Sequence, residues 1–134
     1  MPIADTDFLF SLSPNDKKHK YAMGILDTVE NIKVPDIVLL EYQTVLMNRG
    51  ISFQNIKRVF LALQEIFWQY KIETIHAIDI SHLILGLNLR INYNFSFFDS
   101  LVAAATIMSD QIIISDDRVF DKIDTIERIP ISGK

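Results

Sequence analysis

The chain has 134 residues, 49% hydrophobic and 22% charged, a balance typical of one globular domain with a substantial core. It has no cysteine, which excludes disulfides and cysteine–zinc sites, and no apolar run approaches the roughly 18 residues of a membrane span. A net charge of −4 argues against binding nucleic acid by bulk attraction alone. The N-terminus shows no signal pattern, so we expect a cytoplasmic protein with a single domain over 1–134.

The first half of the chain predicts two short strands, each followed by a helix. The first strand ends near Asp5, and a helix with a basic start follows over 17–29. Residues 32–35 predict the second strand. The next helix is predicted over 36–49, capped by Asp36 and stopped by the glycine that follows it.

The clearest helix is predicted over 52–70. Its aromatic and aliphatic residues recur at steps of three and four: Phe53, Ile56, Phe60, Leu63, Phe67 and Tyr70. Such a stripe, with Trp68 beside it, is typical of a core-facing surface, and a dimer surface is the alternative. The stripe offers more apolar surface than a small sheet covers, so we expect a homodimer that uses helices from 36–70.

The second half of the chain continues the alternation of strands and helices. A third strand is predicted over 71–78. Residues 83–91 fit both a strand and a helix, and we expect a helix. An alanine-rich helix over 97–108 precedes a strand at 112–114, and a last strand lies within 126–131. Because the strand at 112–114 is apolar throughout, it is typical of a strand buried on both faces, which indicates an α/β domain with a parallel sheet.

The motifs of several familiar enzymes are missing, so acidic residues carry the chemical signal. The glycines form no phosphate loop, and the histidines lack metalloprotease spacing. Asp5, Asp99 and Asp117 each follow a predicted strand or begin a predicted helix, and Glu41 lies about one turn inside another. Alone, each is more typical of a helix cap or a helix edge. In an open parallel sheet these positions converge at one edge, where oxygen ligands suit Mg²⁺ or Mn²⁺.

Four segments of the chain resemble the acidic motifs of PIN-domain nucleases. They are residues 3–7, 34–41, 98–105 and 113–120, and their order covers nearly the whole chain. The length is similar to that of the small toxin of VapBC-type toxin–antitoxin pairs, the VapC-like component. The resemblance implies a three-layer α/β/α fold with a mostly parallel central sheet. It also implies endonucleolytic cleavage of RNA with Mg²⁺ or Mn²⁺.

By this resemblance, Asp5, Glu41, Asp99 and Asp117 form an acidic quartet that holds one or two cations and hydrolyses RNA phosphodiesters. All four are therefore candidate catalytic and metal-binding residues.

Four neighbouring residues are secondary candidates: Thr6, Asp7, Ser115 and Asp116. Ser115 and Thr6 match the family's hydroxyl positions, before the last acid and after the first. Whether Asp116 or Asp117 reaches the metal stays open, although the phenylalanine three residues after Asp117 favours Asp117.

The partners expected from the resemblance are RNA and a small antitoxin protein, with no membrane. A PIN-type nuclease of RNA maturation or turnover, without an antitoxin, is the alternative. A receiver-like Mg²⁺-binding signalling domain could use Asp79 as acceptor, but it would also have a lysine after the strand at 112–114, and none is present. A non-catalytic binding domain that keeps the PIN fold is the remaining possibility.

Overall fold

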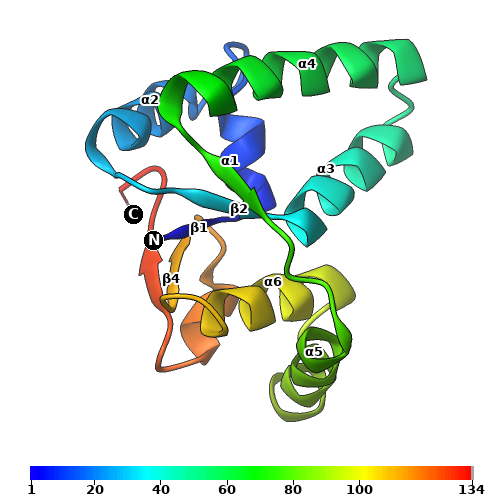
Figure 1. Cartoon of the computed structure of the whole chain (residues 1–134), viewed down its shortest axis with the longest axis vertical. Coiled ribbons are helices and arrows are strands. Elements are labelled where there is room, and N and C mark those ends of the chain that lie inside the picture. Colours follow the sequence, from blue (N-terminus) through cyan, green and yellow to red (C-terminus); the bar gives the residue numbers. More distant parts are fainter. Residues whose placement is uncertain (134) are drawn as a thin grey trace.

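A central sheet of five parallel strands organises the chain (Figure 1). The computed structural model describes residues 1–133. The strands are β1 (Ile3–Ala4), β2 (Lys33–Pro35), β3 (Glu73–Ile75), β4 (Ile112–Ile114) and β5 (Glu127–Ile129). Their spatial order is β3-β2-β1-β4-β5, and every neighbouring pair is parallel. The predicted α/β fold with a mostly parallel sheet is confirmed.

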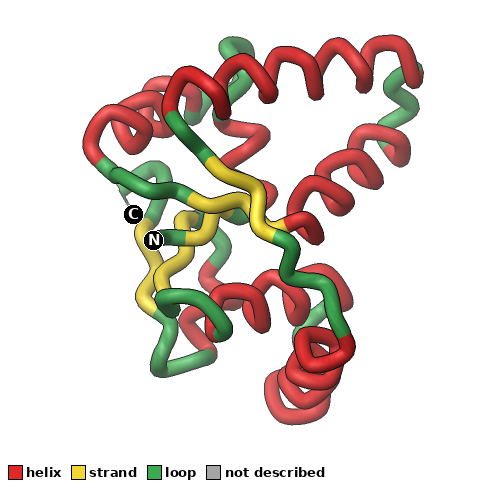
Figure 2. The backbone as a smooth tube through the Cα atoms, in the orientation of Figure 1, coloured by secondary structure: helices red, strands yellow, loops and turns green. Residues whose placement is uncertain are grey.

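Helices cover both faces of this sheet. They are α1 (Thr6–Ser11), α2 (His19–Thr28), α3 (Asp36–Asn48), α4 (Phe53–Tyr70), α5 (Ile80–Tyr93), α6 (Phe97–Ile107) and the short 3-10 helix η1 (Arg118–Lys122). Figure 2 shows α2 and α4 on one side of the sheet and α5 and α6 on the other, which gives the three layers. No helix in the described part of the chain has the length and apolar character needed to cross a membrane.

Strand β1 is the point at which the sheet changes its direction of growth. Strands β2 and β3 extend the sheet on one side of β1, and β4 and β5 extend it on the other. The register pairs Ile3 with Ile113 and Ala4 with Ile114, so β1 and β4 end side by side. Ligand sites of open parallel sheets form at such switch points, beyond the carboxyl ends of the strands.

The two central strands are buried on both faces. The side chains of Ile3, Ala4, Ile113 and Ile114 are inaccessible to solvent, as the apolar run of β4 predicted. Helix α6 packs on this layer through Ala103–Ala105, which are at most 2% exposed. Because alanine side chains are small, the backbone of α6 lies close to the sheet, and this fixes the position of its first turn.

Helices α5 and α6 approach each other closely at one glycine. A Cβ atom built on Gly86 would lie 2.8 Å from Cδ2 of Leu101, too close for any larger residue without a shift. The fully buried imidazole of His82 joins the same two helices, with its Nε2 2.7 Å from the carbonyl oxygen of Leu101. His82 therefore has a structural role, holding α5 and α6 together.

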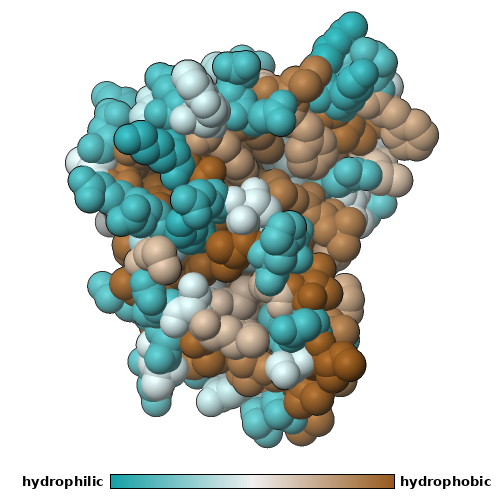
Figure 3. Space-filling view, in the orientation of Figure 1, coloured by the Kyte–Doolittle hydropathy of each residue, from teal (hydrophilic) through white to brown (hydrophobic). Residues whose placement is uncertain are grey.

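The ambiguous segment near residue 87 is helical, as predicted. The alternating leucines were compatible with a strand, but in α5 they spread around the helix. One face of α5 remains exposed and apolar, and Figure 3 shows it as part of a hydrophobic surface. This face, the α5 stripe, consists of Ile80, Leu83, Ile84, Leu87 and Ile91.

Two predictions about the helices are corrected. Pro35, not Asp36, is the N-cap of α3. The Asp36 carboxylate accepts the backbone N–H of Ile37 in the first turn (2.9 Å) and also those of Ala77 (3.1 Å) and Ile78 (3.4 Å). It therefore ties the segment after β3 to the start of α3. Phe53 was expected in the core-facing stripe of α4 but is 78% exposed, because this end of α4 extends past the sheet (Figure 1).

The rest of that stripe packs as predicted. Ile56 and Leu63 are buried, and Phe60 and Phe67 are half-buried against the core. Trp68 lies outside the stripe and is 83% exposed.

Candidate active site

Asp5 is the innermost acid of the site. It follows β1 directly and caps α1, with Oδ1 accepting the backbone N–H of Thr6 (2.8 Å). Its other oxygen accepts the hydroxyl of Ser115 (2.7 Å). The residue is only 7% exposed, and this burial raises the pKa of Asp5 to about 7 despite the two hydrogen bonds, with further contributions from the charges of Glu41 and Asp99.

Ser115 connects the ends of β1 and β4. Its hydroxyl donates to Asp5 and also accepts the backbone N–H of Asp117 (3.0 Å). Asp117 in turn caps η1, with Oδ1 accepting the N–H of Val119 (3.0 Å). Because Ser115 is fully buried and has both bonds, it fixes the first and last acids relative to each other.

Glu41 comes to the same place from α3. Its carboxylate accepts the hydroxyl of Thr6, the residue directly after Asp5. Burial raises the pKa of Glu41, the bond from Thr6 opposes this, and the nearby charges of Asp99 and Asp117 raise it further. The two hydroxyl residues singled out in the sequence thus orient one acid each.

Asp99 is the fourth acid, and it is not a helix cap. Ser96 caps α6 by accepting the N–H of Asp99 (3.3 Å), which places Asp99 in the first turn. Burial raises the pKa of Asp99, and the charge of Asp117 adds to this effect, while Ser96 and Lys122 oppose it. Asp5 and Asp117 are helix caps as well as cavity acids, whereas Glu41 and Asp99 are not caps.

Asp116 and Asp7 belong to a separate network on the cavity wall. The ammonium of Lys18 lies 2.9 Å from Asp116 and 3.2 Å from Asp7. The second oxygen of Asp116 accepts the backbone N–H groups of Ile131 (2.8 Å) and Ser132 (3.1 Å). Partial burial opposes ionisation of Asp116, but the bonds from Lys18 and Ser132 outweigh it and lower the pKa of this carboxyl below its usual value.

The four acids of the quartet, with Asp7 and Asp116, line one cavity of about 460 Å³ at the carboxyl edge of the sheet. Its lining comprises the quartet together with Thr6, Asp7, Phe10, Lys18, Val45, Arg49 and Asp116. Among residues 1–133, however, no three His, Cys, Asp or Glu side chains already converge tightly enough to hold an ion. The acids surround a shared space rather than a single point.

The chemistry of this lining nevertheless fits a hard divalent cation. The donors are carboxylate and hydroxyl oxygens, the type that Mg²⁺ and Mn²⁺ prefer. The charge of Asp117 adds to the raised pKa values of Glu41 and Asp99, and the charges of Glu41 and Asp99 add to that of Asp5, which is the effect of negative charge without a matching positive one. A cation in the cavity would relieve this repulsion.

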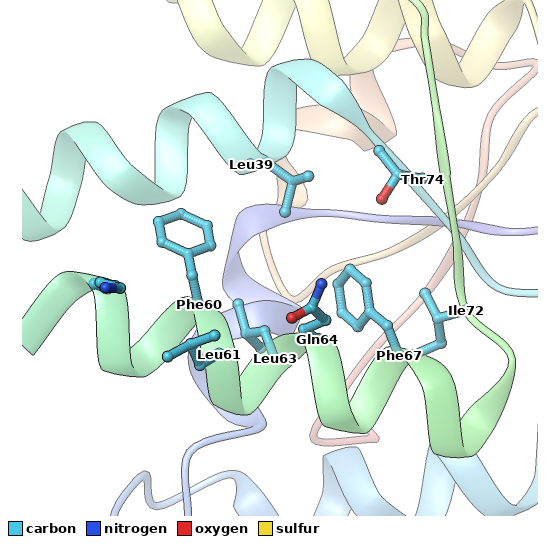
Figure 4. Close-up of a pocket in the computed structure, with 9 residues that line it drawn as sticks. Leu39, Phe60, Leu61, Leu63, Gln64, Phe67, Ile72 and Thr74 are labelled. Atoms are coloured by element: carbon cyan, nitrogen blue, oxygen red, sulfur yellow. The ribbon is translucent and has the colours of Figure 1, made fainter.

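A second cavity, the apolar groove, lies away from the acids. It has about 470 Å³ and lies between α3, α4 and β3, with Phe60 and Phe67 projecting into it beside Leu39 (Figure 4). Its lining contains no acid, and its one charged residue is Lys57. The groove therefore offers apolar contact and no acid–base or metal chemistry.

Sequence reasoning missed four residues that line the acidic cavity: Phe10, Lys18, Val45 and Arg49. Lys18 lies in a basic run that is typical of a solvated surface, and the sequence does not indicate which lysine turns inward. A signal for Arg49 was present, because Glu41, Val45 and Arg49 are four residues apart and share one face of a helix.

Comparison with solved structures gives the same fold. The VapC20 toxin of Mycobacterium tuberculosis, described as cleaving the sarcin-ricin loop, matches with a TM-score of 0.72 at 19% identity, over 91% of this chain and 94% of the toxin. VapBC2 from Rickettsia felis, solved with a DNA fragment from its promoter, matches with a TM-score of 0.70 at 15% identity, over 96% of each chain. At these identities the likeness shows the fold alone.

Comparison with family models gives the assignment. Among curated proteins, no sequence matches this chain. The PIN domain model, in contrast, matches residues 3–126, which include all four acids of the quartet. The strand order also differs from the 2-1-3-4-5 order of receiver domains. The protein therefore belongs to the PIN domain family.

Proposed function

We propose that the protein is an endoribonuclease that depends on Mg²⁺ or Mn²⁺, and that Asp5, Glu41, Asp99 and Asp117 form its catalytic quartet. The observation that carries this proposal is the convergence of four acids, from four separate segments, on one cavity at the switch point of the sheet. The raised pKa values of Asp5, Glu41 and Asp99 support it, because an acidic cluster destabilises a fold unless it binds a ligand.

Three of the four acids have a defined task in this proposal. Asp5 and Glu41 are held in place by Ser115 and Thr6, so their oxygens are oriented before a ligand arrives. When bound, Mg²⁺ or Mn²⁺ supplies positive charge to the phosphodiester and lowers the pKa of a water. Asp117 is the one exposed member of the quartet, and in this proposal it accepts the proton of the attacking water.

The choice between Asp116 and Asp117 follows from their contacts. Both oxygens of Asp116 are engaged, one by Lys18 and the other by the backbone near residue 131. Asp117 uses one oxygen to cap η1 and is linked through Ser115 to Asp5. These contacts favour Asp117 as the ligand and Asp116 as a structural residue.

The biological role that we propose is that of the toxin in a type II toxin–antitoxin pair, acting in the cytoplasm. The solved toxins of this fold support it, and so does the apolar groove, which suits an amphipathic segment of a small antitoxin (Figure 4). An adjacent small reading frame whose product co-purifies with this chain and inhibits cleavage would support the toxin. Without such a partner, the protein is a nuclease of RNA maturation or turnover.

A homodimer is also part of the proposal. The α5 stripe exposes five large apolar side chains, more than α3 or α4 exposes within 36–70. We therefore assign the dimer contact to α5. Sedimentation should give a dimer for the wild type and a monomer for Leu87→Glu, which introduces a charge at the centre of the stripe. A monomeric wild type at high micromolar concentration contradicts the assignment.

The decisive experiment is cleavage of single-stranded RNA by the purified protein. We expect cleavage with Mg²⁺ or Mn²⁺, and none in EDTA. Cleavage that persists unchanged in EDTA contradicts the metal-dependent mechanism, and absence of cleavage with every divalent ion favours a non-catalytic binding domain.

A further inference from the structure

Arg49 is held over the ring of Phe10 at the edge of the acidic cavity. Its guanidinium carbon lies 4.6 Å from the ring centroid, and both residues line the cavity. The Phe10 ring is itself packed against Tyr42, with the ring centroids 4.6 Å apart. Arg49 is exposed, so this stacking on a half-buried ring is what defines the position of its charge.

Arg49 is also the cavity cation whose charge is not matched by an acid. Two cations line the cavity, and Lys18 is bound to Asp7 and Asp116. In the part of the chain that the structure describes, no carboxylate lies within ion-pair distance of Arg49. The Phe10 ring contacts the guanidinium through its carbon atom, and because Arg49 is exposed, the N–H donors around that carbon are accessible to a ligand.

We infer that Arg49 binds a phosphate group of the RNA strand that flanks the scissile phosphate, with Phe10 as its platform. The inference rests on the proposed ribonuclease function. The cavity wall carries six carboxylates on a protein of net charge −4, so a polyanionic strand needs a local cation in order to enter. A metal within the quartet serves only the phosphate that it touches.

The position of Arg49, directly at the C-terminal end of α3, explains why the bound phosphate flanks the scissile one. Glu41 and Arg49 share one face of the helix but are eight residues apart, which is about 12 Å along the helix axis. Arginine matches a phosphate through two parallel N–H···O bonds, and its stacked guanidinium loses little freedom when it binds. Arg49 is thus a substrate-binding residue, and Phe10 is a positioning residue.

The test measures the binding of a short, fluorescein-labelled single-stranded RNA of mixed sequence. Binding is measured in the Asp99→Asn background with Mg²⁺, so that cleavage does not interfere. Arg49→Gln should weaken binding about tenfold and reduce the slope of log K against log salt by about 0.7, the loss of one phosphate contact. Arg49→Lys keeps the charge and should restore the slope but not the full affinity.

The matched control is Arg58→Gln, which removes the same charge from an exposed position of α4 outside the acidic cavity. It should bind RNA like the parent protein. Phe10→Leu should weaken binding less than Arg49→Gln does. The double variant should bind RNA as weakly as Arg49→Gln alone, because the effect of Phe10 acts through Arg49.

Cleavage kinetics of the same variants without the Asp99→Asn substitution separate this inference from the proposed function. Arg49→Gln should raise KM for RNA with little change in kcat, since it removes binding that the ground state and transition state share. The role of Arg49 is overturned if Arg49→Gln and its parent bind RNA with the same affinity and salt slope. It is also overturned if Arg58→Gln loses as much RNA affinity as Arg49→Gln does, even when the wild type cleaves RNA. If the wild type cleaves no RNA, the proposed function fails, whereas the binding measurement still decides on Arg49.

Discussion

The acidic cavity and the apolar groove are almost equal in volume, about 460 and 470 Å³, but they are built in opposite ways. The groove lies mainly between two helices that are consecutive in sequence, and two of its residues, Leu63 and Ile72, belong to the buried core. The cavity gathers acids from four separate segments, and its charges oppose one another. The groove therefore contributes to the stability of the protein, while the cavity reduces it in exchange for a site.

The largest expected effect is the loss of catalysis at the cavity. Asp99→Asn should reduce RNA cleavage more than about 100-fold while the circular-dichroism spectrum stays unchanged, because a ligand of the cation is lost but no cap or core contact. Asp124→Asn, which changes the same charge at an exposed position outside the cavity, is the control. Retained cleavage in Asp99→Asn would remove Asp99 from the quartet.

A substitution in the apolar groove should change the stability of the protein but not its RNA cleavage. Leu63 is buried and lines the groove, so Leu63→Ala should lower the free energy of unfolding by about 3 kcal/mol. Urea unfolding measures this loss. Below the transition, cleavage per folded molecule should equal that of the wild type, and a drop in cleavage by folded protein would show that the two regions are coupled.

Metal should stabilise the protein through the cavity alone. Mg²⁺ at about 100 times its dissociation constant should raise the free energy of unfolding by about 2.7 kcal/mol. Asp99→Asn should lose most of this gain, and Leu63→Ala should keep it. Thermal melting with and without Mg²⁺ distinguishes these variants, and an equal gain in all of them would indicate that Mg²⁺ binds elsewhere.

The smallest expected effect is a gain in stability on removal of an acid. Burial raises the pKa of Asp5 from 3.8 to about 7, and the pKa values of Glu41 and Asp99 are raised as well. A carboxyl with a raised folded pKa contributes stability below its unfolded pKa, and this contribution is lost as pH rises through the folded pKa. The metal-free protein should therefore lose stability between about pH 4 and pH 7.

Asp99→Asn should recover about 1 kcal/mol of this loss at pH 7.5 and little at pH 4, a modest gain because Asp99 is only half-buried and water screens its charge. Melting of the metal-free proteins at both pH values measures the gain. A lower melting temperature for the variant at pH 7.5 would mean that Asp99 is a stabilising ion-pair partner, contrary to the idea of a repulsive cavity.

Much of the fold could be predicted because it depends on local patterns. The apolar run of β4, the small residues of α6 and the stripe of α4 each indicate a type of burial that the structure has. The start of α3 at Asp36 agrees with the prediction, but the bonds that its carboxylate accepts from the backbone near residue 77 could not be predicted, since they are a tertiary contact. The exposure of Phe53 depends on how far α4 extends past the sheet, which its own sequence does not specify.

The candidate site divides in the same way. Each of the four acids lies in a recognisable local context, at the end of a strand or near the start of a helix. Lys18 lies in a run of basic residues that looks the same whichever of them turns inward, and only its distance to Asp116 distinguishes it. Sequence therefore indicates the residues that would perform the chemistry better than it indicates those that arrange the charges around them.

The contacts of Asp116 have a practical consequence for work with this protein. Residues 131 and 132 hold one oxygen of Asp116 through two backbone N–H bonds, although this carboxylate already lines the cavity. Shortening the chain before Ile131, or attaching a tag that pulls this segment away, would free that oxygen to bind the metal, while Lys18 still holds the other. Affinity for Mg²⁺ and the choice between Mg²⁺ and Mn²⁺ should then change although no residue of the quartet has been altered, so enzymology on this protein should use tags at the N-terminus.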